Sequence, residues 1–270
     1  MLDTFQTFSP IHPIIKQYVD YYYLDIKPYN ELKEYQCFPH YNNTISIYKS
    51  HILNENDNVE YKENADACQI FTPIREQVLT VKQIGKVHRI VIVFHPLGIQ
   101  QFYDGLNFGA SIKDFDFLSR NELEEIFKTF EIETLTELLD NSLRKRFKVF
   151  NHPILEEGIQ YIYYRDSDFS VESLSEHMGI SRQHINRLFK LHLGVSAKRF
   201  ADIYRFRQTI NKKIHCTSEE SLTELAHQFN FSDQSHFNKI YKTFTLMSPK
   251  NFFDKGTKLG NRDTFWHFKE

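Results

Sequence analysis

Cysteine is scarce in this sequence. Only three of its 270 residues are cysteines, and Cys37, Cys68 and Cys216 stand far apart, without a CxxC pair or a Cys/His spacing typical of zinc. An odd number of isolated cysteines argues against a disulfide framework and against a structural zinc site. We therefore expect a reducing compartment, and no metal or other cofactor.

Long apolar runs are also lacking. The longest, Ile90–Phe94, is much shorter than the roughly 20 residues that a membrane-spanning helix needs. The N-terminal segment MLDTFQTFSP is not basic and no apolar stretch follows it, so it does not read as a signal peptide. The prediction is a cytoplasmic protein with no membrane partner.

Catalytic motifs are missing as well. The chain shows no phosphate-binding glycine loop, no paired nucleophile and base, and no spaced pair of carboxylates. We predict that the protein is not an enzyme and has no catalytic residues. One rival hypothesis, an enzymatic or metal-binding β domain, depends on five N-terminal histidines that lack ligand spacing: His12, His40, His51, His88 and His95.

Charge is present but unevenly distributed. The net charge of -2 separates into -5 for residues 1–150, +2 for residues 151–256 and +1 for residues 257–270. Between residues 181 and 213, nine lysines and arginines accompany a single acid, Asp202. A basic stripe on an otherwise balanced domain suits the binding of phosphates, although a solvated helix face would show the same charge.

A helix-turn-helix pattern occupies residues 169–188. Val171–Met178 has the apolar spacing of a helix and follows Ser170, a predicted N-cap. Gly179 permits the left-handed backbone at which a helix ends, and Ser181 is predicted to cap a second helix with a polar outward side. This arrangement is typical of units that enter the major groove of DNA.

The same pattern returns in the next part of the chain. Ser175, Gly179 and Ser181 correspond to Ala226, Asn230 and Ser232 at an offset of 51, and Ile185 and Ser196 correspond to Phe237 and Ser248 at an offset of 52. One residue is thus inserted near the start of the second polar helix, which Ser232 is predicted to cap. An internal repeat indicates one structural unit used twice, and residues 196–214 are predicted to form a long helix between the two units.

The repeated run GISRQHINRLFKLHLGVS, followed by FSDQSHFNKIYK and a Ser-Pro pair, resembles the DNA-binding domain of the AraC/XylS transcriptional regulators. The resemblance covers residues 153–255 and implies a bacterial regulator with two helix-turn-helix units. The chain departs from the family where Asn230 and Leu246 replace the usual glycines and where Ala197 replaces a frequent proline. Leu246 puts the form of the turn that follows it in question.

This resemblance places the outward side chains of both polar helices against DNA. Arginine suits guanine, and asparagine or glutamine suits adenine, because each presents paired hydrogen-bonding groups to a base edge. Base contacts are predicted for Gln183, Asn186 and Arg187 on the first helix and for Gln234, Ser235, His236 and Lys239 on the second. Phosphate contacts are predicted for Arg182, Lys190 and Lys242. The alternative for each residue is a solvated surface position.

The N-terminal half reads as a β-rich domain. Composition and alternation predict strands within residues 18–24, 44–48, 68–72, 77–84 and 87–94. Gly85-Lys86 is a candidate hairpin turn, residues 54–66 read as a polar loop, and residues 97–103 as a short helix. Short strands at this spacing suggest a small antiparallel barrel or sandwich.

Amphipathic helices are predicted at residues 119–130 and 133–147. The second carries an apolar stripe that includes Leu135, Leu139 and Leu143. This stripe can pack onto the N-terminal sheet or form a homodimer seam. The run FPHYNNTISIY, with KVHRIVIVFHPLGIQQFYD further on, is similar to a β-rich domain found on a subset of AraC-type regulators, which implies a sensing or dimerisation role.

The predicted fold is α+β. Residues 1–150 form a β-rich sensing or dimerisation domain with flanking helices, residues 151–256 an all-α double helix-turn-helix domain, and residues 257–270 a tail that docks onto a core. The predicted function is sequence-specific regulation of transcription on double-stranded promoter DNA. The expected partners are a second copy of the chain, a small-molecule effector and RNA polymerase. The alternative is a regulator without an effector, whose N-terminal domain only dimerises or recruits a partner.

Overall fold

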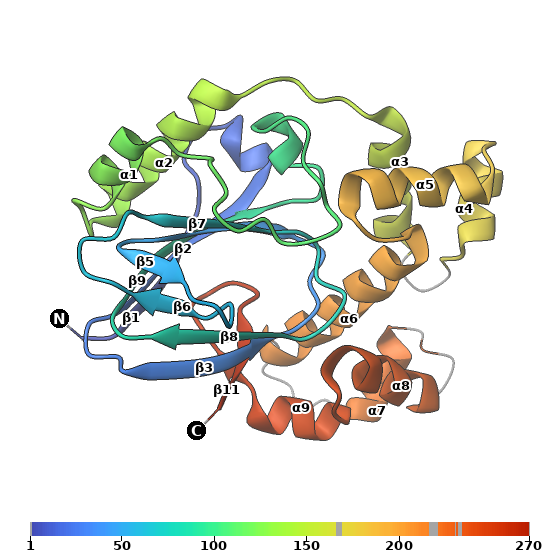
Figure 1. Ribbon diagram of the computed structural model, residues 1–270. Helices are drawn as coiled ribbons and strands as arrows, with labels where there is room; N and C mark the ends of the chain where they lie inside the picture. Colours follow the sequence, from blue (N-terminus) through green and yellow to red (C-terminus); the bar gives the residue numbers. More distant parts are fainter. Residues whose placement is uncertain (1, 166–168, 216–220, 230, 232–233, 270) are drawn as a thin grey trace.

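The computed structural model describes residues 2–165, 169–215, 221–229, 231 and 234–269. Figure 1 shows the N-terminal half as two facing sheets with helices along one side, and the C-terminal half as a group of helices beside the sheets. The strands are β1 (Thr4–Phe8), β2 (Val19–Lys27), β3 (Leu32–Cys37), β4 (Asn43–Tyr48), β5 (His51–Leu53), β6 (Val59–Tyr61), β7 (Cys68–Thr72), β8 (Leu79–Ile84), β9 (Val87–Phe94), β10 (Thr257–Lys258) and β11 (Phe265–Lys269).

The helices of the N-terminal half are the short 3-10 turns η1 (Ile15–Gln17) and η2 (Ile99–Gln101), and α1 (Arg120–Ile126) and α2 (Ile132–Arg146). Those of the C-terminal half are α3 (Pro153–Arg165), α4 (Val171–Met178), α5 (Arg182–Leu193), α6 (Ala197–His215), α7 (Leu222–Gln228), α8 (Gln234–Thr245) and α9 (Pro249–Lys255). No helix in these parts of the chain is both long and apolar enough to cross a bilayer.

The two sheets form an open sandwich. One has five strands in the order β1-β2-β9-β4-β7, and the other has six in the order β10-β11-β3-β8-β6-β5. Neighbouring strands are antiparallel except β6 and β8, which are parallel. The two sheets are not joined into a closed barrel. Of the two predicted folds, barrel and sandwich, the structure therefore shows the sandwich.

Three local expectations for this half are wrong. Gly85 turns with φ 74°, but β8 and β9 on either side of it belong to different sheets, so the turn is a corner and not a hairpin. Within the predicted loop 54–66, Val59–Tyr61 forms β6, because pairing with β5 and β8 overrides its polar composition. The predicted helix at residues 97–103 is only the single turn η2.

The main N-terminal core lies between the five-stranded sheet and its helices. Successive side chains of a strand point to opposite faces, and on β4 Ile45 and Ile47 are fully buried on the helix side. Leu135, Leu139 and Leu143 of α2 are fully buried in the same apolar cluster. The stripe on α2 therefore packs onto the sheet, as the first of its two interpretations predicted.

The end of the chain returns to the N-terminal half. After α9, residues 257–269, here called the C-terminal strap, run back to the six-stranded sheet (Figure 1). There β11 pairs antiparallel with β3, with His267 opposite Gln36 and Lys269 opposite Glu34. One sheet thus contains strands from both ends of the sequence, which ties the two halves of the molecule together.

Candidate functional site

The first helix-turn-helix unit consists of α4 and α5. Ser170 caps α4 by accepting a hydrogen bond from the Ser173 amide at 3.0 Å, and Gly179 ends it with φ 64°. Ser181 caps α5 by accepting from the His184 amide at 3.2 Å. These caps and the glycine turn confirm the local structure predicted for residues 169–188.

The second unit, α7 and α8, repeats the turn of the first. The Ile180 amide donates to the Ser175 carbonyl at 3.3 Å, and the Phe231 amide donates to the Ala226 carbonyl at 3.1 Å. The residues of the second bond follow those of the first at the predicted offset of 51. Each turn is therefore closed by a backbone hydrogen bond between equivalent residues. The predicted turn residue Asn230 and cap Ser232 lie outside the described residues.

Helix α6 connects the two units (Figure 1). Its inward side chains Phe200, Ile203 and Phe206 are fully buried in an apolar cluster shared by both units. Thr209 Oγ1 of α6 lies 2.7 Å from the Tyr241 hydroxyl of α8. Both units are therefore packed on a single frame, as the predicted long helix requires.

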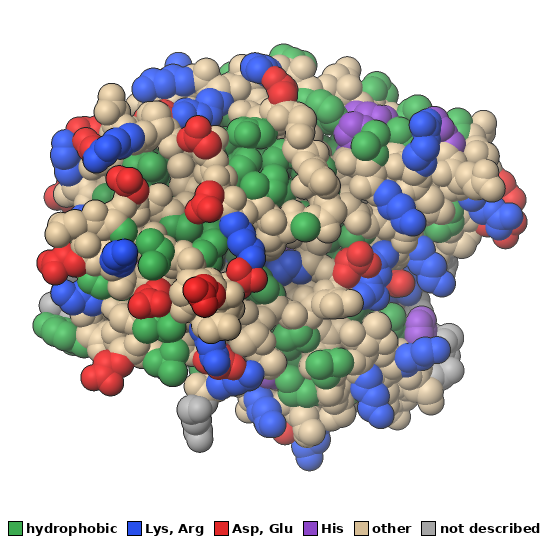
Figure 2. Space-filling view, viewed as in Figure 1, with side chains coloured by type: hydrophobic (Ala, Val, Ile, Leu, Met, Phe, Trp, Pro, Cys, Tyr) green, Lys and Arg blue, Asp and Glu red, His purple; other side chains and the backbone are tan. Residues whose placement is uncertain are grey.

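Most residues predicted to contact DNA lie on the outer surface of α5 and α8. The exposed ones are Arg182, Gln183, Arg187, Lys190, Gln234, Ser235, Lys239 and Lys242, whereas Asn186 and His236 are half-buried. Figure 2 shows lysine and arginine side chains along the helical half of the molecule, with acidic side chains gathered mainly over the sheets. The helical half therefore offers cationic surface on both units.

Two residues of the first polar helix already have partners within the protein. Asn186 Oδ1 accepts a hydrogen bond from the Ala197 amide at 3.2 Å, at the start of α6. Arg187 Nη2 lies 3.1 Å from His184 Nδ1 on the preceding turn of the same helix. Asn186 thus has a structural role at the α5–α6 junction, while the Arg187 side chain remains exposed.

The second unit presents a residue that the sequence argument omitted. Asn238 stands 52 positions after Asn186, but the position equivalent to Ala197 is Pro249, which has no amide hydrogen to donate. Asn238 instead lines a shallow surface depression on α8 with Ser235, Lys239, Lys242 and Thr243. The offset of 52, together with proline at position 249, could have identified Asn238 from the sequence.

The basic run at residues 181–213 is not a continuous DNA-facing stripe. Arg207 is buried, and its Nε donates to Asp263 Oδ2 of the C-terminal strap at 2.9 Å. Arg199 Nε donates to Glu76 Oε2 of the N-terminal half at 3.0 Å. Part of the charge that suggested phosphate binding therefore holds the two halves of the molecule together.

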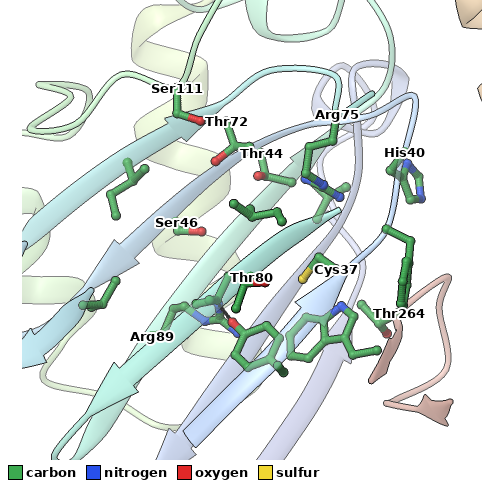
Figure 3. Close-up of a pocket in the computed structure, with 18 of the residues that line it drawn as sticks. Cys37, His40, Thr44, Ser46, Thr72, Arg75, Thr80, Arg89, Ser111 and Thr264 are labelled. Carbon is green, nitrogen blue, oxygen red and sulfur yellow. Dashed lines mark hydrogen bonds between the residues drawn. The ribbon is translucent and has the colours of Figure 1, made fainter. Parts of the chain in front are cut away.

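A cavity of about 310 Å³ lies between the two sheets. Figure 3 shows hydroxyl side chains of Thr44, Ser46 and Thr72 on one wall, with Arg75 to their right and Arg89 at the lower end. The C-terminal strap closes another side through Thr264 and Trp266. Trp266 stacks on Tyr35 of β3 with ring centroids 4.4 Å apart.

Arg89 is the buried charge at one end of this cavity. It donates to Asp25 Oδ2 at 2.8 Å, to the Tyr35 hydroxyl at 2.6 Å and to the Tyr48 hydroxyl at 3.1 Å. Burial by itself lowers the pKa of Arg89, but Tyr23, Tyr35, Tyr48 and Asp25 raise it, so that the pKa lies well above its usual value. Arg89 is therefore a permanent cation with acceptors supplied by the protein.

Asp263 joins three parts of the chain. Besides Arg207 of α6, it contacts His40, whose Nε2 lies 3.0 Å from Asp263 Oδ2. Burial by itself raises the pKa of Asp263, but the Arg207 guanidinium and His40 more than offset this, and the carboxyl stays ionised. The Asn42 amide donates to His40 Nδ1 at 3.1 Å, so neutral His40 carries its proton on Nε2 and donates it to Asp263.

Three of the five N-terminal histidines have different partners within the protein. His40 contacts the strap, His51 Nε2 lies 2.9 Å from the Lys86 carbonyl oxygen, and His88 stacks on Phe130. In the part of the chain that the structure describes, no three His, Cys, Asp or Glu side chains are grouped as metal ligands would be. His40, His51 and His88 thus each have contacts within the protein.

Comparison with known proteins finds relatives among regulators of transcription. Residues 174–255 match the family model described as a helix-turn-helix domain. The arabinose operon regulatory protein of Escherichia coli is 28% identical over 124 residues, which cover 43% of this chain and 42% of that protein. An uncharacterized HTH-type transcriptional regulator of Staphylococcus aureus is 33% identical over 86 residues, 32% of this chain and 11% of that protein.

The chain thus spans less than half the length of these relatives. Among solved structures, ToxT from Vibrio cholerae shares 12% identity with it, at a TM-score of 0.47 over 93% of this chain and 97% of that chain. This likeness is too distant to add to the architecture described above.

Proposed function

We propose that this chain is a transcriptional regulator of the AraC/XylS family, and that its double helix-turn-helix domain binds specific sites in double-stranded DNA. The observation that carries the proposal is the repeated unit, with two turns closed by the same backbone hydrogen bond and packed on α6. Two polar helices on one frame suit two successive major grooves on one face of DNA, about 34 Å apart.

The side chains divide into two roles by their chemistry. We assign base contacts to Gln183 and Arg187 on α5 and to the exposed residues of α8, because amide and guanidinium groups match the donors and acceptors of base edges. We assign phosphate contacts to Arg182, Lys190 and Lys242, whose charge attracts the backbone without reading its sequence. We assign a base contact to Asn186 through its side-chain amide nitrogen only, since its Oδ1 already accepts a hydrogen bond from the Ala197 amide.

The first experiment is selection of genomic DNA fragments by the purified protein at near-physiological salt. We expect a motif with two boxes about one helical turn apart. Arg187→Ala should weaken binding to that motif by about 1–3 kcal/mol and relax specificity at one base pair. Lys190→Ala should weaken specific and random DNA alike and flatten the salt dependence of binding.

Lys145→Ala, on the exposed side of α2 in the N-terminal half, is the matched control and should leave DNA binding unchanged. If Arg187→Ala bound both motif and random DNA as tightly as the unaltered protein, the base-reading assignment would be wrong. Recovery of random DNA only, by a correctly folded protein, would contradict sequence-specific regulation.

We further propose that the N-terminal domain senses a small molecule in the cavity between its sheets. Support comes from the size of the cavity and from the strap, which is part of its wall and is connected to α6 through Asp263 and Arg207. A homodimer, recruitment of RNA polymerase, the absence of catalysis and a cytoplasmic location belong to the same proposal.

One variant separates this hypothesis from a regulator without an effector. Ser46→Leu fills part of the cavity from β4. If the domain senses an effector, this variant should change transcription from the selected operator while the purified protein keeps its operator affinity. If the domain only dimerises or recruits a partner, transcription should stay at the level of the unaltered protein.

A further inference from the structure

Part of the inner face of the sandwich is polar, although aromatic and apolar side chains such as Tyr35, Val93 and Trp266 line the rest of it. Sheets that pack face to face ordinarily bury apolar side chains between them. On β4, however, the apolar Ile45 and Ile47 face the helices, while Thr44 and Ser46 line the space between the sheets. Further hydroxyls reach the same space from Thr72, Thr80 and Ser111 (Figure 3). Such a wall suits an occupant that forms many hydrogen bonds.

Arg75 adds a positive charge that no acid in the described part of the chain pairs with. It follows β7, and in Figure 3 its side chain extends into the cavity. Its buried Nε has no hydrogen-bond partner, and its guanidinium has no ion pair with any acid among the described residues. An arginine remains charged at all physiological pH values, and a partly buried charge without a partner is unfavourable.

The other cations that line this cavity are paired with carboxylates of the protein. These pairs are Arg89 with Asp25, Arg207 with Asp263, Lys82 with Glu34, and Lys113 with Asp57. Arg75 therefore differs from them, and an anion between the sheets would give it the partner that it lacks. Arginine binds carboxylates well, because its planar group can donate two parallel hydrogen bonds.

Extending the proposed function, we propose that the cavity binds a small hydroxylated organic acid. Its carboxylate pairs with Arg75, its hydroxyl groups bond to the threonine and serine side chains, and the ligand fills the space up to the C-terminal strap. A cavity of about 310 Å³ lies at the lower end of the range for small-molecule sites, about 300–1,000 Å³. The ligand is therefore compact.

Both chemical features of the ligand are required for specificity. A neutral sugar or polyol would leave the Arg75 guanidinium unpaired, and a fatty acid would leave the hydroxyl wall without partners. Sites built from buried polar groups reject analogues that lack the matching group, because those groups are then unsatisfied. The cavity should thus distinguish a hydroxy acid from either relative.

The test is direct binding to the full chain in the absence of DNA, so its outcome does not depend on the outcome for operator binding. The probes are D-gluconate, D-galacturonate and citrate, with sorbitol as the uncharged control and decanoate as the acid without hydroxyl groups. Trp266 is the only tryptophan and lies in the cavity wall, so its fluorescence reports binding together with calorimetry.

We expect at least one hydroxy acid to bind with a Kd below about 1 mM, and sorbitol and decanoate to bind more weakly or not at all. Arg75→Gln should weaken that binding about tenfold or more, because a charge-assisted pair is lost. Lys269→Gln removes a surface cation that Glu34 pairs and that does not line the cavity, and should leave binding unchanged.

Three results would overturn the proposal. If the folded protein bound none of the three acids, hydroxylated organic acids would be excluded as its ligands. Tighter binding of sorbitol or decanoate would replace it with a polyol or a fatty acid. Equal binding by Arg75→Gln and the unaltered protein would remove the anchoring role of Arg75.

Discussion

Equivalent residues of the two repeats have different roles. Gly194 ends α5 with φ 80°, and a Cβ atom there would lie only 2.3 Å from the Phe108 carbonyl oxygen of the N-terminal half. Its repeat equivalent, Leu246, has φ 63° and is 80% exposed. The turn at Leu246 therefore keeps the left-handed backbone, although leucine replaces the usual glycine there. Only the first unit needs a glycine, because only Gly194 packs directly against the N-terminal half.

Leu246→Gly is predicted to stabilise the protein. A left-handed backbone costs a leucine roughly 1–2 kcal/mol, while glycine brings an entropic penalty of roughly 0.5–1 kcal/mol, so the net gain should be about 0.5–1 kcal/mol. Urea denaturation monitored by circular dichroism measures it. Leu246→Ala keeps the Cβ atom and should show no such gain; equal stability of both variants would contradict the strain argument.

The paired asparagines provide a second contrast between the repeats. Asn186→Ala removes the hydrogen bond to the Ala197 amide and should reduce the free energy of unfolding by about 1 kcal/mol. Asn238→Ala removes no bond that the structure shows and should leave stability unchanged, but should reduce operator affinity by about 1–3 kcal/mol if Asn238 reads a base. Loss of stability in Asn238→Ala without loss of affinity would refute this division.

Among the elements, the C-terminal strap links the most distant parts of the chain. It adds β11 to the N-terminal sheet, places Trp266 on Tyr35, and binds α9 through His267, whose Nε2 lies 2.8 Å from the Phe252 carbonyl oxygen. Its Asp263 neutralises Arg207 of α6. The strap thus fixes the position of the second helix-turn-helix unit relative to the cavity.

Asp263→Ala is predicted to loosen the strap. It leaves Arg207 buried without a counter-charge, which costs about 3 kcal/mol when one partner of a buried pair is removed. We expect Trp266 fluorescence to shift to longer wavelength as the indole becomes exposed. Lys269→Ala, which removes only a surface ion pair with Glu34, should shift neither the fluorescence nor the stability by a comparable amount.

At the scale of the whole molecule, the N-terminal half holds each helix-turn-helix unit by contacts of its own. The first unit is held by the Gln100 side chain, whose Nε2 donates to the His192 carbonyl at 2.8 Å, and by the approach of Gly194 to Phe108. The second unit is held by the strap. A change in the cavity that moves the strap would therefore reach α6 through Asp263 and Arg207.

The junction between the halves should weaken in acid. Burial and the Arg207 charge lower the pKa of His40 from 6.5 to about 4, while Asp263 acts in the opposite direction and Arg75 adds to the lowering. Below pH 6.5 the unfolded chain binds a proton at His40 that the folded protein does not, so stability falls as the pH approaches 4. The loss should reach up to about 3 kcal/mol.

Urea denaturation at pH 7.0 and pH 4.5 measures this effect. His40→Gln has no titrating group at this position and should lose less stability between these two pH values than the unaltered protein does. The pKa of His88 is also lowered to about 4, chiefly by burial, so part of the acid sensitivity should remain in the variant. An identical loss of stability in both proteins would exclude His40 as a source.

Local features of the fold followed from neighbouring residues. The caps Ser170 and Ser181, the turn at Gly179 and the buried stripe of α2 depend on spacings of a few residues, which the sequence displays directly. The repeat was also visible in the sequence, because equivalent residues of its two copies are separated by a constant offset that changes only once, by one residue. The surfaces of α5 and α8 were predicted on the same basis, and their contacts with DNA stay a prediction.

The two helix-turn-helix units and five of the eleven strands in the described residues could be predicted from the sequence, because caps, turns and apolar periodicity act over short distances. Three features could be seen only in the folded molecule: β8 and β9 enter different sheets, the strap pairs with β3, and Arg207 is buried beside Asp263. Those contacts join residues far apart in the chain, and pairing across such distances leaves no periodic signal. The cavity and its unpaired Arg75 exist only because the two sheets face each other.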